Sequence, residues 1–247
     1  MAVNKLKQNK EVQGRVRDFQ ARNEANRRRL FVIKRDNIIA IVISIVAIIA
    51  VVSVQFFISQ NASPENPDTS KVAPSPDLAE NRIWTGEMKI DQAALEFELF
   101  GDLAPQAVSS FVNLANKDFF EKVSCHRLTN YGAMSVLQCG DPLGNGLGGP
   151  GYTFGPIENA PADQLYPAGY LAMARPGENP NGMGSQFFII LSDAKIPNDN
   201  VGGYTVFGKI TSGLDDLIKD VTSLGVVGGA EDGKPVAPAV LSSISVE

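Results

Sequence analysis

The sequence has very few of the side chains that catalytic metal sites use. Among 247 residues there are one histidine and two cysteines. A structural or catalytic zinc site takes about four nitrogen, sulfur or oxygen ligands, and the chain contains no CxxC or HxxxH spacing. We therefore expect no metal site.

Two other catalytic arrangements are excluded by local pattern. Cys125 and His126 are adjacent, and neighbouring residues on a strand point to opposite faces, so they cannot form a thiol–imidazole pair there. The glycine-rich stretch 144–151 has no Gly-Lys-Ser/Thr and no helical pattern after it, which argues against a phosphate loop.

Positive charge is scarce in the larger part of the chain. The net charge is −5, but residues 1–36 have 11 Lys or Arg against 4 Asp or Glu, whereas residues 81–247 have 10 against 19. Binding to nucleic acid depends on neutralising phosphates with Lys and Arg, so we expect no nucleic-acid partner for the acidic part. A basic arm can also indicate nucleic acid, but this arm adjoins an apolar run, which favours a juxtamembrane role.

The apolar run predicts a transmembrane helix. Residues 38–58 contain no charge, and Ser44, Ser53 and Gln55 are their only polar residues. About 20 apolar residues cross a bilayer as a helix, and the basic side faces the cytoplasm. We therefore predict a single-pass protein of the cell membrane with a basic cytoplasmic tail (1–36), a transmembrane helix (37–59), a Pro/Ser/Asn-rich linker (60–81) and an extracytoplasmic domain (82–247).

Alternatives remain for the first 60 residues. A cleaved signal peptide is less favoured, because the basic region is long and the apolar core exceeds the usual length of about 7–15 residues. The basic tail could lie along the anionic inner leaflet or be a solvated tail.

The domain has the pattern of a mainly β fold. Leu95, Phe97 and Leu99 alternate with glutamates, as in a half-buried antiparallel strand. Further strands are predicted at 84–90, 187–191, 206–210 and 240–246. Pro105 begins a helix over 105–116, and a second helix follows at 214–221. Many short strands with two helices indicate a closed antiparallel barrel.

Four short blocks lie in order within this domain. They are Cys125-His126-Arg127, Gln138-Cys139-Gly140-Asp141, Gly184-Ser185-Gln186-Phe187-Phe188 and Val206-Phe207-Gly208. Residues 84–246 thereby resemble the cyclophilin family of peptidyl-prolyl cis/trans isomerases, in a membrane-anchored bacterial form. The resemblance implies an eight-stranded antiparallel closed β-barrel capped by two α-helices. It also implies prolyl isomerase activity that needs no cofactor.

Prolyl isomerisation explains why an arginine is needed. Rotation about the peptide bond has a barrier of about 18–20 kcal/mol because of amide resonance. A hydrogen bond to the prolyl nitrogen in the twisted state, where its lone pair is localised, stabilises the transition state. Arg127 matches the family arginine, is always charged, and is our candidate for this role. Gln138 matches the glutamine that holds this arginine and the substrate backbone.

The resemblance also implies a set of substrate-binding residues. Phe188 would form the floor of the proline pocket, and Phe187 would face the core. The complete set of predicted substrate-binding residues is Phe188, Gln186, Ala174, Arg175 (through its backbone), Val136, Ile196 and Tyr204. Tyr204 stands where the family often has histidine.

Several positions differ from the family pattern. Ser135-Val136 replaces a Phe-Met pair, Arg175-Pro176 replaces Asn-Ala, and Lys195 replaces a tryptophan. A wider, less apolar pocket and weak cyclosporin binding are expected. Two functions follow: an isomerase that assists proline-containing exported proteins, or a membrane-tethered peptide-binding or chaperone module whose isomerase activity is weak or lost.

The cysteines and the histidine are given structural roles. If Arg127 and Gln138 share a face, strand alternation places Cys125 on that face and Cys139 on the other. We therefore predict free thiols, although disulfides are common outside the cytoplasm. His126 is predicted to be a core histidine that is hydrogen-bonded to the backbone.

Overall fold

The computed structural model describes residues 72–131 and 134–247. All of them lie within the compact unit Asn66–Glu247. The predicted basic tail, the predicted transmembrane helix and the first part of the predicted linker lie outside the described residues. Within the described ranges, no helix is long and apolar enough to span a membrane.

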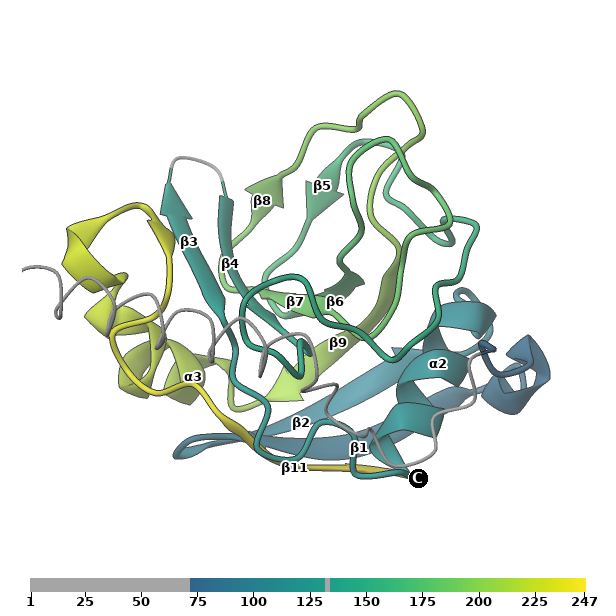
Figure 1. The fold of residues 1–247 in the computed structure, drawn as a ribbon, viewed down its shortest axis with the longest axis horizontal. Coiled ribbons are helices and arrows are strands. Elements are labelled where there is room, and N and C mark those ends of the chain that lie inside the picture. Colours follow the sequence, from purple (N-terminus) through teal and green to yellow (C-terminus); the bar gives the residue numbers. More distant parts are fainter. Residues whose placement is uncertain (1–71, 132–133) are drawn as a thin grey trace, which may run out of the picture. The chain divides into compact units, whose positions relative to one another are not determined.

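The described residues contain eleven strands and two α-helices (Figure 1). The helices are α2 (Pro105–Ala115) and α3 (Leu214–Asp220), and three short 3-10 helices are η1 (Pro76–Ala79), η2 (Thr222–Leu224) and η3 (Val227–Gly229). The strands are β1 (Ile83–Ile90), β2 (Ala93–Phe100), β3 (Arg127–Tyr131), β4 (Met134–Cys139), β5 (Leu165–Tyr166), β6 (Tyr170–Met173), β7 (Phe187–Ile190), β8 (Ala194–Lys195), β9 (Val206–Ser212), β10 (Asp232–Gly233) and β11 (Leu241–Val246).

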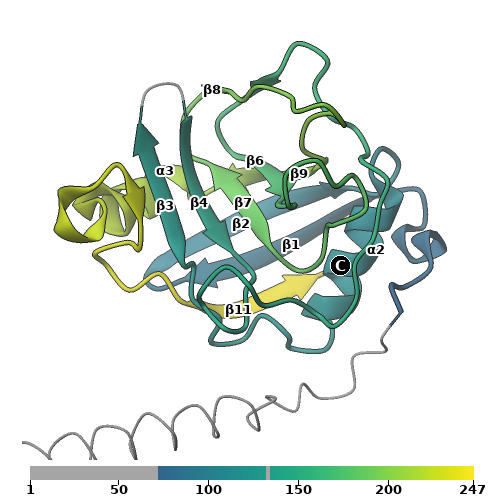
Figure 2. The same cartoon turned by 45° about the horizontal axis from the view of Figure 1, so that its top comes forward.

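Nine strands form one curled antiparallel sheet in the order β10-β3-β4-β7-β6-β9-β2-β1-β11. The helices α2 and α3 lie at opposite ends of this curled sheet in two views (Figures 1 and 2), and both contribute buried residues to the same core. A separate two-stranded ladder joins β5 and β8. The mainly β class and the two α-helices are therefore confirmed.

The predicted closed barrel of eight strands is wrong. The sheet has nine strands, and its ends, β10 and β11, are not paired with each other in the described residues. The residues just before β3 and just before β11 form no regular ladder with each other; an isolated bridge joins Ser124 to Val240 there. Because β10 has only two residues, it pairs with β3 over a short length and does not extend the sheet to closure.

The core lies between the sheet and α2. Leu95, Phe97 and Leu99 are buried on alternate positions of β2, as the period-2 pattern predicts. Phe111 of α2 contacts Phe97 at a ring separation of 6.0 Å. It also lies 5.4 Å from Phe187, which confirms that Phe187 faces the core. Full burial of an apolar side chain of this size contributes roughly 1.5–3 kcal/mol to folding.

The residues just before β1 pack against α2. The indole nitrogen of Trp84 donates to the carbonyl of Ala79 over 2.9 Å, and Ser109 Oγ donates to the carbonyl of Pro76 over 3.0 Å. Ser75 caps η1 through its side chain. The last residues of the predicted linker are therefore part of the folded domain.

A disulfide joins Cys125 to Cys139, so the prediction of free thiols is wrong. The predicted register itself holds, because Arg127 is paired directly with Gln138. The error lies in extending the strand alternation beyond its end. The strand begins at Arg127, and the Cys125 amide donates instead to the carbonyl of Ala239. Both cysteine side chains consequently reach the buried side of the sheet.

Candidate active site

Four adjacent strands bring the candidate site residues into one row. Arg127 of β3 is opposite Gln138 of β4, which is opposite Phe188 of β7, which in turn is opposite Ala172 of β6. Side chains of directly paired residues lie on the same face of a sheet. The pairing therefore places the guanidinium, the amide and the phenyl ring side by side across the sheet.

A chain of hydrogen bonds fixes the polar half of this row. Arg127 Nη1 donates to Gln138 Oε1 over 3.3 Å, and Gln138 Nε2 donates to Gln186 Oε1 over 2.9 Å. Gln186 Nε2 donates in turn to the carbonyls of Gly146 and Gly148, at 3.0 and 2.9 Å. Each amide has its oxygen directed toward the preceding donor, so the two glutamines are oriented from both ends.

Asp232 of β10 holds the other edge of Arg127. Arg127 Nε donates to Asp232 Oδ1 over 2.8 Å, and Nη2 donates to Oδ2 over 2.7 Å. These hydrogen bonds from Arg127 lower the pKa of the Asp232 carboxyl below its ordinary value. Asp232 was not among the predicted site residues, because it lies outside the four blocks and in a strand of two residues that shows no periodic pattern.

The apolar half of the row is a small cluster separate from the main core. Val136, Phe188 and Ile196 are buried there, and Ala174 packs at its edge. Tyr204 is half-buried, and its ring meets that of Phe188 edge to face at 5.3 Å. We call this group (Val136, Phe188, Ala174, Ile196, Tyr204) the apolar site cluster. It contains five of the seven predicted substrate-binding residues.

Two hollows lie beside Gln138. One has a volume of about 520 Å³ and is lined by Gln138, Gln186, Ala174 and Arg175, together with the glycine-rich segment 146–149. The other, of about 410 Å³, is lined by His126, Arg127, Gln138 and Asp232 among others. Gln138 and Gly146 line both hollows, so Gln138 lies where the two open spaces adjoin, and Arg127 lines the second of them.

The side chain of Arg175 is only 2% exposed and is fully engaged within the protein. It donates to both carboxylate oxygens of Asp199, at 2.8 and 2.9 Å, and to the carbonyls of Gly202 and Gly203. This pairing holds the pKa of Asp199 well below its usual range. The guanidinium therefore links the segment that contains Arg175 to the loop 199–203. Only the backbone of Arg175 can contact a substrate.

His126 does not have the predicted core position. It is half-buried, it lines the second hollow, and its Nδ1 is buried without a described hydrogen-bond partner. Burial lowers its pKa; the nearby Asp141 opposes this shift, and Arg127 adds to it. Among the described residues no hydrogen bond joins the His126 ring to the backbone, so that prediction is wrong.

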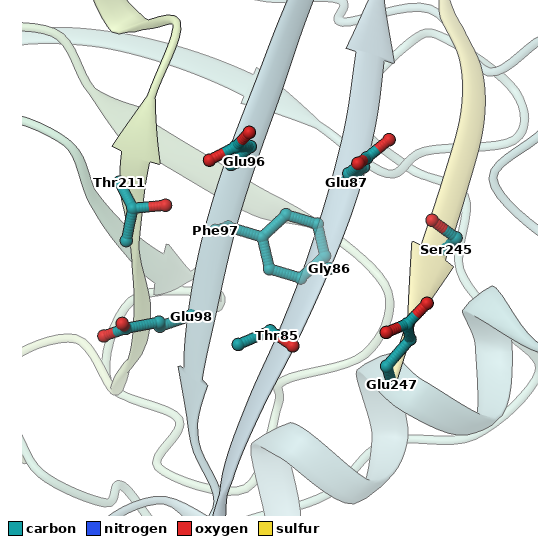
Figure 3. A pocket seen from close by; sticks show the side chains of 9 residues that line it. All are labelled: Thr85, Gly86, Glu87, Glu96, Phe97, Glu98, Thr211, Ser245 and Glu247. Atoms are coloured by element: carbon teal, nitrogen blue, oxygen red, sulfur yellow. The ribbon is translucent and has the colours of Figure 1, made fainter.

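The outer face of the sheet carries a different hollow, of about 440 Å³ (Figure 3). Glu87, Glu96, Glu98 and Glu247 surround it on β1, β2 and the end of the chain after β11. It contains none of the predicted site residues. Its acidic lining offers no cation for an amide nitrogen, so the row that contains Arg127 is the better candidate site.

Comparisons with known proteins show the family to which this chain belongs. A family model described as "Cyclophilin type peptidyl-prolyl cis-trans isomerase/CLD" matches residues 85–246. The "Probable peptidyl-prolyl cis-trans isomerase B" of Mycobacterium tuberculosis is 39% identical over 201 residues, which cover 70% of this chain and 62% of the relative. The chain therefore spans less than two thirds of that relative. The "Peptidyl-prolyl cis-trans isomerase B" of Bacillus subtilis is 41% identical over 140 residues, which cover 53% of this chain and 91% of the relative.

Solved structures show the same fold. A cyclophilin-type peptidyl-prolyl cis-trans isomerase of Cryptosporidium parvum matches with a TM-score of 0.56 and 28% identity. The match covers 67% of this chain and 98% of that one. A second structure of that protein, in the presence of the dipeptide Ala-Pro, matches with a TM-score of 0.54. Since nearly the whole of the other chain is covered, a domain of this kind folds on its own.

Proposed function

Because this chain belongs to the cyclophilin-type peptidyl-prolyl cis-trans isomerase family, we propose that its domain catalyses isomerisation of X-Pro bonds in polypeptides. The observation that supports this most strongly is the cross-strand row of Arg127, Gln138 and Phe188. It places a fixed cation beside an apolar surface, the two features that a twisting prolyl amide requires.

The proposed mechanism uses fixed electrostatics and no covalent step. The proline ring rests on Phe188, with Val136 and Ile196 beside it. The Arg127 guanidinium donates to the prolyl nitrogen as the amide twists and its lone pair localises. Gln138 and Gln186 are already oriented by hydrogen bonds, so little reorganisation is needed in the transition state. The backbone next to Ala174 borders the hollow in which the rest of the peptide would lie.

The test measures exchange between cis and trans forms of a proline peptide by NMR, with purified residues 66–247. We expect exchange to be accelerated by the wild type and to fall by about 10²-fold or more in Arg127→Ala, as when a single donor to a developing charge is removed. Undiminished exchange in Arg127→Ala would refute the role proposed for this residue.

A second candidate function is peptide binding with little catalysis. Val136 and Ser135 stand where the family has larger side chains, and a loosely filled pocket would hold proline without pressing it against Arg127. The Ala-Pro dipeptide in the related structure supports proline-containing ligands for either function. The same NMR titration separates the two, since binding without accelerated exchange identifies the second.

We also propose that the domain acts on exported proteins outside the cytoplasmic membrane. The uncharged run 38–58 and its basic flank support an anchor with a cytoplasmic N-terminus. The disulfide between Cys125 and Cys139 supports an oxidising compartment. Protease digestion of intact cells or spheroplasts tests the topology: the domain should be cleaved while a cytoplasmic control protein stays whole. Protection of the domain until the membrane is lysed would overturn the proposal.

A further inference from the structure

We propose that Asp232 is a positioning residue for the isomerisation: its carboxylate sets the orientation in which Arg127 meets the prolyl nitrogen. The inference rests on the proposed role of Arg127 and extends it to a residue on a separate segment of the chain, 105 residues further on. It concerns how the arginine is held, since Asp232 itself need not touch the peptide.

The geometry of the pair is what positions the guanidinium. Its Nε and Nη2 both donate to Asp232, at 2.8 and 2.7 Å, one to each carboxylate oxygen. This two-point contact fixes the plane of the guanidinium as well as its place. The opposite edge, through Nη1, is directed to Gln138. Asp232 and Gln138 therefore hold the cation from two sides, and the Gln138 contact alone, at 3.3 Å, is the weaker of the two.

Asp232 can impose this orientation because its own segment is anchored. Asp232 and Gly233 pair with β3, the strand that begins with Arg127. The Asn130 amide donates to the carbonyl of Glu231 over 2.8 Å, and the Val227 amide donates to the carbonyl of Lys234 over 2.9 Å. Main-chain hydrogen bonds thus fix the chain on both sides of the carboxylate, and the carboxylate stays in register with the arginine.

The exposure of the pair argues for a role in catalysis over one in folding. The two side chains are about equally exposed, at 40% and 39%. Ion pairs this open to water contribute little to folding stability. Misplacement of a catalytic group by about 1 Å, in contrast, can cost as much as about 10²-fold in rate. Loss of Asp232 should therefore appear in the rate constant at saturation more than in stability or peptide affinity.

The same contact would have the opposite effect if it kept Arg127 away from the substrate. The carboxylate would then compete with the prolyl nitrogen for the guanidinium, and its removal would raise the rate. The sign of the change in an Asp232 variant separates positioning from restraint.

The experiment compares Asp232→Asn with wild type in residues 66–247. Asparagine keeps the shape and one acceptor but loses the charge and the second acceptor. Exchange rates at saturating proline peptide and the Kd of that peptide are measured by NMR. We expect the rate at saturation to fall about tenfold, equivalent to roughly 1.4 kcal/mol, while the Kd changes by less than about twofold. Asp232→Glu, which keeps the carboxylate, should recover part of the rate.

Two further variants make the result specific. Glu231→Gln removes a neighbouring exposed carboxylate with the same change in net charge, and its rate should equal that of wild type. In an Arg127→Ala background, Asp232→Asn should have no further effect, because the carboxylate acts only through the arginine. Urea unfolding of each variant confirms that folding is intact.

The outcomes distinguish this inference from the proposal on which it rests. An Asp232→Asn rate equal to or above that of wild type, together with collapse in Arg127→Ala, overturns the inference alone. An additional loss from Asp232→Asn in the absence of Arg127 also overturns it. Full activity in Arg127→Ala overturns both.

Discussion

Removal of the disulfide should destabilise the domain by an amount that the loop length sets. The bridge joins residues 14 apart in the sequence. Closing a loop of about 15 residues restricts the unfolded chain by the equivalent of roughly 3 kcal/mol at 25 °C. Cys125 and Cys139 are both buried, so replacing them with alanine removes some packing as well. We therefore expect Cys125→Ala/Cys139→Ala to lower the free energy of unfolding by about 3 kcal/mol.

Trp84 provides the signal for this measurement. It is the single tryptophan of the chain, it lies in β1, and it is 7% exposed, so its fluorescence should change on unfolding. With a urea m-value of about 1–3 kcal/mol per molar, a loss of 3 kcal/mol lowers the midpoint by roughly 1–3 M. Wild type unfolded in the presence of a dithiol reductant should approach the double variant.

Two results would contradict this prediction. Titration of the oxidised, denatured wild type could find two free thiols, which would exclude the bridge. Alternatively, the double variant could lose less than about 1 kcal/mol, which would mean that the loop closure does not restrict the unfolded chain as calculated.

Three other predictions concern the site. The lone histidine, His126, should titrate in NMR with a midpoint below its ordinary pKa of about 6.5, because burial lowers that pKa. As the pH drops, the unfolded chain then binds the proton before the folded chain does. The free energy of unfolding should therefore fall between a pH of about 6.5 and the lowered pKa. A midpoint above 6.5 would contradict the burial argument. Arg175→Ala should weaken peptide binding and lower the urea midpoint of the domain, because it removes two hydrogen bonds to Asp199 and those to the carbonyls of Gly202 and Gly203; an unchanged midpoint would contradict a role of this side chain in holding the two segments together. Phe188→Ala should cost about 3–5 kcal/mol of stability and abolish binding of proline peptides in the same titration, whereas unchanged affinity would place the pocket elsewhere.

Much of the sheet could be predicted from local patterns. The alternation in β2 identified its buried face, and Pro105 marked the start of α2. The assumption that Arg127 and Gln138 share a face held because both lie within regular, directly paired strands. Patterns of this kind depend on residues close together in the sequence, where periodicity reports the backbone geometry.

The features that escaped prediction depend on where regular structure stops or on distant partners. The disulfide was missed because the strand begins two residues after Cys125. Asp232 gave no signal because β10 has only two residues. The burial of Arg175 could not be inferred because its partner, Asp199, is 24 residues away. Neither the end of a strand nor a contact between residues far apart in the sequence produces a periodic pattern of residue types.

The hydrogen bonds from Gln186 to the segment 146–148 are made to main-chain carbonyls, which are present whatever side chain the segment has. The loop contributes to the site through the carbonyls of Gly146 and Gly148, so the network does not depend on the side chain between them. That side chain, Leu147, is 86% exposed at the rim of the hollow. Under the proposed function, mutation at this position would change which polypeptides are favoured while Arg127 and Gln138 keep their hydrogen bonds. If the domain acts as proposed, its preference among polypeptides can change through residue 147 without a compensating change in the hydrogen-bonded row.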